Sequence, residues 1–172
     1  MKKLIFLLAF VALFVSCKSD KKEEPNQEVE PTVYYLIRHA EKDRSIKNDD
    51  PGLTQKGLER ANNWAKILNE KEIDLVFSTD YKRTLKTASP IASVKNLKVL
   101  RYDPKNLYDD DFKAQTKGKS SVIVGHSNTT PAFVNTILGK QKYDQINDSD
   151  NGKMFIVSII NDSVLVKIED YN

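Results

Sequence analysis

The stretch YYLIRHAEKD, residues 34–43, is an apolar run that ends abruptly in charged residues. The wider run TVYYLI, residues 32–37, has the β-branched and aromatic composition of a buried strand. Arg38, His39 and Glu41 follow it directly, where the strand is expected to end. Because ligands bind outside the carboxyl ends of strands in open α/β sheets, this junction is the first candidate site.

Beyond this strand, short apolar runs alternate with amphipathic segments, which predicts an α/β architecture. Further strands are expected at 73–78, 97–102 and 121–125, with a final hairpin at 153–160 and 163–168 that turns at Asn161-Asp162. Helices are expected after the N-cap Thr54, from Tyr81 to about Val94 with a disturbance at Pro90, and from Thr130-Pro131 to Gly139. We therefore predict a three-layer sandwich whose central sheet is mostly parallel and is flanked by helices.

The N-terminal segment has a different composition. Lys2 and Lys3 precede LIFLLAFVALFV, an apolar run that is too short for a comfortable bilayer span and is typical of a secretion signal. Cys17, the single cysteine, follows in FVSC, which resembles a bacterial lipoprotein lipobox and implies that this cysteine carries lipid. An ordinary signal peptide with an incidental cysteine is the alternative.

These features divide the chain into three parts. A signal peptide is expected over residues 1–16, a charged, proline-containing tether over 17–31, and one folded domain over 32–172. The resemblance to a lipoprotein implies a location in the cell envelope, periplasmic or at the cell surface, with Cys17 anchoring the chain to a bacterial membrane.

The charge balance excludes one class of partner. The formal net charge is +3, and removal of Lys2 and Lys3 with the signal leaves +1. No strongly basic face is therefore expected, and nucleic acid is not a predicted partner. The two histidines and the scattered carboxylates match no metal-ligand spacing, so neither a metal nor a cofactor is predicted.

The second histidine, His126, directly follows the apolar run SVIVG. If that strand neighbours the first one, His39 and His126 face the same crevice at the carboxyl ends of the sheet. Arg83 falls in the first turn of a helix that starts at the same edge, although alone it would read as a solvated residue. Arginine binds phosphate oxygens bidentately, so Arg38, Arg83 and helix N-terminal amides predict an anion pocket.

These residues resemble a known family. Arg38-His39-Ala40-Glu41 is similar to the RHG/RHA signature of the histidine phosphatase (phosphoglycerate mutase-like) superfamily. Three further motifs follow in family order: Leu53-Thr54 with Gly57, Ser78 through Arg83-Thr84 and Thr87-Ala88, and Gly125-His126-Ser127. The resemblance implies that His39 is a nucleophile that carries a phosphohistidine, that Arg38, Arg83 and His126 bind the phosphate, and that no metal is needed.

The proton donor for the leaving group departs from the family pattern. Many members use a glutamate after the third strand, whereas this chain has RYDPKNLYDDDF there. Asp103 is the predicted general acid because it lies just after that strand. Glu41 is the alternative acid, and Asp109, Asp110 and Asp111 are further rivals that read better as surface charges.

The resemblance implies a phosphomonoesterase that acts on a small phosphate ester or a phosphoprotein. The domain of about 141 residues is similar to the small phosphohistidine-phosphatase (SixA-like) branch rather than to the longer mutases. A non-catalytic lipoprotein that only binds phosphate or another anion remains the alternative. An α/β-hydrolase is excluded, because Thr129 replaces the last glycine of the G-x-S-x-G elbow and no histidine follows Ser127.

Overall fold

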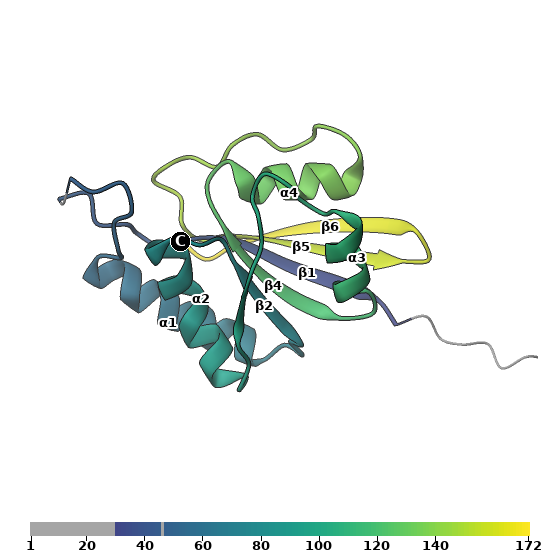
Figure 1. The fold of residues 1–172 in the computed structure, drawn as a ribbon, viewed down its shortest axis with the longest axis horizontal. Helices are drawn as coiled ribbons and strands as arrows, with labels where there is room; N and C mark the ends of the chain where they lie inside the picture. Colours follow the sequence, from purple (N-terminus) through teal and green to yellow (C-terminus); the bar gives the residue numbers. More distant parts are fainter. Residues whose placement is uncertain (1–29, 46) are drawn as a thin grey trace, which may run out of the picture.

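Strand β1 (Thr32–Arg38) lies near the middle of a six-stranded sheet with the order β3-β2-β4-β1-β5-β6 (Figure 1). The computed structural model describes residues 30–45 and 47–172. The predicted signal peptide, Cys17 and all but the last two residues of the predicted tether lie outside the described residues, so the predicted domain boundaries stay predictions.

The remaining strands match the predicted runs. They are β2 (Leu75–Ser78), β3 (Val99–Arg101), β4 (Ser120–Gly125), β5 (Lys153–Ile160) and β6 (Ser163–Asp170). Strands β3, β2, β4 and β1 are parallel, while β5 and β6 form an antiparallel hairpin that pairs with β1. Asn161 and Asp162 turn this hairpin with positive φ angles, as a two-residue turn between twisted strands requires. The prediction of a mostly parallel sheet is confirmed.

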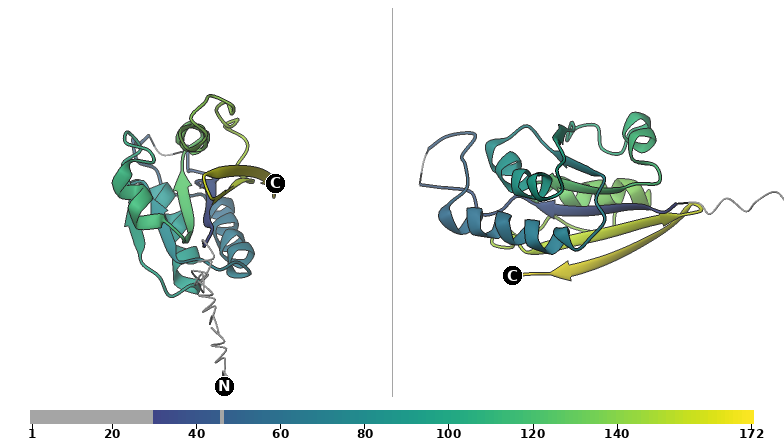
Figure 2. Two further views of the ribbon diagram at one scale, coloured as in Figure 1. Left: turned by 90° about the vertical axis from the view of Figure 1, so that its right-hand side faces the viewer. Right: turned by 90° about the horizontal axis from the view of Figure 1, so that it is seen from below.

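Helices cover both faces of the sheet (Figures 1 and 2). They are α1 (Gln55–Asn69), α2 (Lys82–Val94), α3 (Asp110–Thr116) and α4 (Thr129–Leu138). Helices α1 and α2 lie side by side on one face, whereas α3 and α4 cover the other. No helix within the described ranges has both the length and the apolar character that a bilayer span needs.

Side chains that alternate between the two faces of each strand form two hydrophobic cores, one on each side of the sheet. Leu36 and Phe77 pack with Phe112 and Phe133 beneath α3 and α4. Their strand neighbours Ile37 and Val76, with Val122 and Val124, instead pack against a set that belongs to α1 and α2: Trp64, Ala65, Leu68, Ala88, Ile91 and Ala92. Because successive side chains of a strand point to opposite faces, each central strand serves both cores. The predicted three-layer sandwich is therefore confirmed.

Two helical features differ from the prediction. Helix α3 was not predicted, because its seven residues begin within a run of aspartates that reads as surface charge. Asp109 is in fact its N-cap, and its carboxylate accepts the Phe112 amide at 2.8 Å. Helix α2 also continues through Pro90 instead of being disturbed there. Ile91, which follows the proline, is fully buried, so packing against the core holds the helix together across the lost hydrogen bond.

Gly57 brings helix α1 close to the end of β1. Thr54 caps the helix, since its hydroxyl accepts the Gly57 amide at 3.0 Å. A Cβ atom at Gly57 would lie 2.4 Å from the carbonyl oxygen of Glu41, closer than any real contact. The glycine therefore lets the helix start against the backbone of the segment that carries Arg38 and His39.

Candidate active site

Strands β1 and β4 are direct neighbours, as the histidine argument requires, and their carboxyl ends place His39 beside His126. Arg38 pairs with Gly125 in the parallel register, and the His39 amide donates to the Gly125 carbonyl at 2.9 Å. The two imidazole rings lie edge to face with their centroids 5.5 Å apart. Residues separated by most of the domain in sequence thus meet at one edge of the sheet.

A cavity of about 430 Å³ opens at this edge. Its wall contains Arg38, His39, Arg83 and His126, the four residues that the sequence predicted to lie together, and residues 127–129 at the start of helix α4. The remaining lining residues are Lys42, Tyr81, Pro104, Lys105 and Asp148. Free amides at a helix start favour an anion, so this cavity has the elements of the predicted pocket.

His39 is held in one tautomer. Its Nδ1 atom lies 2.7 Å from the Ala40 carbonyl oxygen, which can only accept a hydrogen bond. Nδ1 therefore carries a proton, and in the neutral ring Nε2 keeps its lone pair. Burial lowers the pKa of His39 to about 3, and the positive charge of Arg38 and Arg83 acts in the same direction. His39 is thus a neutral imidazole at physiological pH, with a free electron pair at Nε2.

His126 has the opposite tautomer. Its Nε2 lies 2.9 Å from the Thr79 hydroxyl, which donates onward to Thr84, so Nε2 is the donor. Its Nδ1 accepts from Arg83 Nη2 at 3.4 Å. Burial lowers the pKa of His126 to about 4, with Arg83 as the next cause. The ring is neutral in this arrangement, and an anion placed between His126 and Arg83 would favour its protonated, doubly donating form.

Each of the two arginines has a buried donor that nothing satisfies. Arg38 is 2 % exposed, and its Nη1 donates to the carbonyls of Asn147 and Asp150, both at 2.9 Å. Arg83 lies over the Tyr81 ring and pairs with Asp50 at 3.6 Å. Within the described part of the chain, neither Nε atom has a partner. Buried unpaired donors are costly, so two of them in the wall of one cavity favour an anionic ligand.

Sequence reasoning missed the contribution of the segment 147–151. Asp148 bonds Arg38 Nη2, and the side-chain amide of Asn151 donates to the His39 carbonyl at 2.8 Å. This polar segment has no apolar period, and nothing in its composition indicated that it returns to the site. Thr79 and Tyr81 were also missed, although both lie in the segment from which Arg83 was selected.

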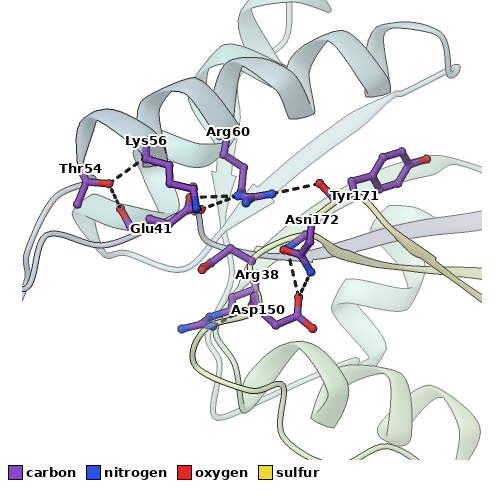
Figure 3. A network of polar contacts seen from close by, with 12 residues as sticks. Arg38, Glu41, Thr54, Lys56, Arg60, Asp150, Tyr171 and Asn172 are labelled. Carbon is purple, nitrogen blue, oxygen red and sulfur yellow. Dashed lines mark hydrogen bonds and ion pairs between the residues drawn. The ribbon is translucent and has the colours of Figure 1, made fainter.

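Glu41, the alternative general acid, forms ion pairs with side chains of helix α1 instead (Figure 3). Its carboxylate accepts from Arg60 Nε at 2.9 and 3.1 Å and lies 3.7 Å from the Lys56 ammonium. Arg60 also donates to the Tyr171 carbonyl at 3.3 Å. Glu41 does not line the cavity, and its contacts brace the segment after His39 against helix α1 and the last residues.

Asp103, the predicted general acid, lies on the rim rather than in the wall. Pro104 and Lys105 line the cavity, whereas Asp103 is exposed and its carboxylate accepts the Lys105 amide at 2.9 Å. Its catalytic role therefore stays a prediction. Two of the other candidate acids have local structural contacts: Asp109 caps α3, and Asp110 pairs with Lys113 at 3.0 Å.

A metal centre has no obvious place in this arrangement. Within residues 30–45 and 47–172, no three His, Cys, Asp or Glu side chains are grouped so that they could hold a metal ion. Catalysis without a metal stays a prediction, which the hydrolysis experiment below tests in the presence of a chelator.

Comparison with known proteins shows which class of protein this arrangement resembles. A family model described as histidine phosphatase superfamily (branch 1) matches residues 34–105, which include Arg38, His39 and Arg83. This part of the chain is thus similar to the histidine phosphatase superfamily.

One curated relative is phosphoserine phosphatase 1 of Hydrogenobacter thermophilus, which is 36% identical over 73 residues. The match covers 40% of this chain and about a third, 35%, of that relative.

Solved structures share the fold over most of the chain. A phosphoserine phosphatase mutant of Entamoeba histolytica, in complex with phosphoserine, superposes with a TM-score of 0.62 at 18% identity and covers 79% of this chain and 95% of its own. A structure assigned to the phosphohistidine phosphatase SixA of Agrobacterium tumefaciens gives a TM-score of 0.60 at 19% identity, over 81% and 99% of the two chains. The predicted phosphoglycerate mutase-like fold is therefore confirmed.

Proposed function

We propose that this chain is a phosphomonoesterase that works through a phosphohistidine on His39, without a metal. The observation that carries the proposal is the state of His39: a neutral ring with an unprotonated Nε2, in a residue that lines the same cavity as two arginines, each with an unsatisfied donor. A nucleophile and a place for the charge of the phosphoryl group are thus present together.

The reaction would take place in two displacements. In the first, the His39 Nε2 lone pair attacks phosphorus, the P–N bond forms, and the P–O bond breaks as the carboxylic acid of Asp103, the proposed general acid, protonates the leaving oxygen. In the second, water attacks phosphorus and gives a proton back to the Asp103 carboxylate, and the P–N electrons return to Nε2 as inorganic phosphate forms. Arg38, Arg83, His126 and the amides at the start of α4 would hold the equatorial oxygens. The Nδ1–H bond to Ala40 would stabilise the positive charge of the phosphorylated ring.

The charge of the cavity supports a substrate with a second acidic group. Lys42 and Lys105 line it and form no ion pair with any residue that the structure describes. A phosphate group would occupy Arg38 and Arg83, which leaves these two lysines for a carboxylate, a further phosphate or an acidic protein segment. A small acidic phosphate ester or a phosphoprotein therefore fits the proposal, and phosphoserine is the first compound to test.

The proposal is tested by hydrolysis of phosphoserine and p-nitrophenyl phosphate in the presence of EDTA. We expect turnover of both by the wild-type chain, and a loss of about 10²-fold in kcat toward phosphoserine in Asp103→Asn, because an alkoxide must be protonated as it leaves. The same variant should hydrolyse p-nitrophenyl phosphate within about threefold of wild type, since p-nitrophenolate leaves without a proton. Equal losses on both substrates would contradict Asp103 as the acid, and turnover lost on addition of EDTA would contradict metal-free catalysis.

We also propose that the domain is held at a membrane outside the cytoplasm by lipid on Cys17. The apolar run and the FVSC motif support this, and so does the direction of β1, which starts at Thr32 and ends at Arg38, where the cavity begins. An anchor that precedes β1 would therefore join the domain at the end of the strand that is farther from the site. Cys17→Ser is expected to move the protein from the membrane fraction to the soluble fraction. Membrane retention of this variant would argue against the anchor.

A further inference from the structure

The described segment that returns to the site carries an acidic residue whose position is unexpected for an anion pocket. The carboxylate of Asp148 bonds Arg38 Nη2 through one oxygen and Arg44 Nη2 through the other. Asp148 also lines the cavity that contains His39 and Arg83. A negative charge thus already occupies a donor of the arginine to which the proposed function assigns the phosphate.

The donors of Arg38 can be counted. A guanidinium has five N–H groups, and Nη1 uses both of its own on the carbonyls of Asn147 and Asp150. Asp148 takes one of the two on Nη2. What remains for a phosphate is the unpartnered Nε–H and one N–H on Nη2. A phosphate bound there would lie next to the Asp148 carboxylate, and both anions would share the positive charge of Arg38.

Arg38 is also held by contacts that do not involve the Asp148 side chain. The two bonds to Nη1 come from main-chain carbonyls, and the segment that supplies them has further contacts of its own, such as that between Asp150 and Asn172 (Figure 3). Asp150 accepts from Lys153 at 2.7 Å and from the Asn172 side-chain amide at 3.0 Å. Loss of the charge at Asp148 should therefore change the electrostatics of the pocket while Arg38 stays in place.

We propose that Asp148 is a resident counter-anion of the phosphate site, which competes with bound phosphate for Arg38 and so weakens the binding of substrate phosphate and of the inorganic phosphate product. This role rests on the proposed function, because it assumes that Arg38 binds phosphate. A site with two arginines, a helix start and a second histidine would otherwise retain its product strongly. When phosphate leaves, the Asp148 carboxylate still neutralises part of the positive charge of Arg38. The free site is therefore less unfavourable than an unpaired guanidinium would be, and this favours release.

The test is the dissociation constant of inorganic phosphate, measured by titration calorimetry at fixed ionic strength on the full-length chain in detergent. We expect Asp148→Asn to bind phosphate about five- to tenfold more tightly than wild type, as removal of one like charge at short range predicts. Asp144→Asn is the matched control: Asp144 is exposed on the same connection between α4 and β5 and does not line the cavity. Its dissociation constant should change less than twofold.

The sign of the change decides the proposal. If Asp148 served only to orient Arg38, Asp148→Asn would bind phosphate more weakly. Phosphate binding by this variant that is equal to or weaker than that of wild type would therefore refute the proposal that Asp148 competes with phosphate. A loss of kcat with an unchanged phosphate constant would make Asp148 a proton donor instead, which also overturns it. A wild-type chain that binds phosphate but hydrolyses nothing would overturn the proposed enzyme and leave this test intact. Absence of phosphate binding by wild type would overturn the anion site and this role together.

Discussion

His39→Ala is expected to lower kcat/KM for p-nitrophenyl phosphate by at least about 10³-fold, because removal of a nucleophile eliminates the covalent route entirely. The other imidazole of the cavity has no free nitrogen with which to replace it: His126 uses Nε2 to donate to Thr79 and Nδ1 to accept from Arg83. The measurement is steady-state hydrolysis, with thermal unfolding to verify that the variant is folded.

Trapping of the intermediate makes this prediction specific. Wild type quenched in alkali during turnover of ³²P-labelled substrate should carry label on His39, and the label should be lost in acid, as expected of a phosphoramidate. His126→Ala is the matched control, because it removes the other imidazole but keeps the nucleophile, and it should still be labelled, more slowly. Labelling of His39→Ala, or activity in it comparable to wild type, would eliminate the mechanism.

The second large effect concerns stability. We expect the ligand-free domain to lose about 2–4 kcal/mol of unfolding free energy between pH 7 and pH 5. An unfolded histidine takes up a proton near its ordinary pKa of 6.5, whereas burial holds the pKa of His39 at about 3 and that of His126 at about 4. Between these values the unfolded chain binds more protons than the folded one, so stability falls as the pH falls. Such a loss is a large part of a typical stability.

This pH dependence has a clean control because the chain contains only two histidines. Urea unfolding at pH 7 and pH 5 should show the loss in wild type and a much smaller one in the double variant His39→Gln/His126→Gln. Saturating phosphate should reduce the loss in wild type, since a bound anion favours protonation of His126. An equal pH dependence in the double variant would assign the effect to carboxylates instead.

The sheet and the positions of His39, His126 and Arg83 could be predicted, because they depend on local sequence patterns. Apolar runs indicate β1 and β4, and the rule for strand ends predicts that His39 and His126 lie together. Arg83 followed from its place in the first turn of α2. Each of these inferences needs only the element on which the residue lies and the edge at which that element ends.

The acids could not be predicted, because their roles depend on which partner comes within reach. Glu41 has the spacing of a catalytic residue but meets Arg60 of α1. Asp103 follows the third strand as expected, yet it bonds the amide of Lys105. Asp148 lies on a polar connection whose path is set by the bonds of its backbone to Arg38. Sequence indicates where a carboxylate is in the chain but not which cation neutralises it.

The bonds of Arg38 to the segment before β5 also bear on how the protein folds. Arg38 and Asp150 are 112 residues apart in sequence, and β1 pairs with β5, which begins at Lys153. Contacts of such long range form late, because the chain must close a large loop before they contribute. A nascent chain that has reached only α4 can therefore pair β1 with β4 but cannot yet fix the guanidinium of Arg38. The phosphate pocket should be the last part of the domain to mature, after synthesis has passed the final hairpin.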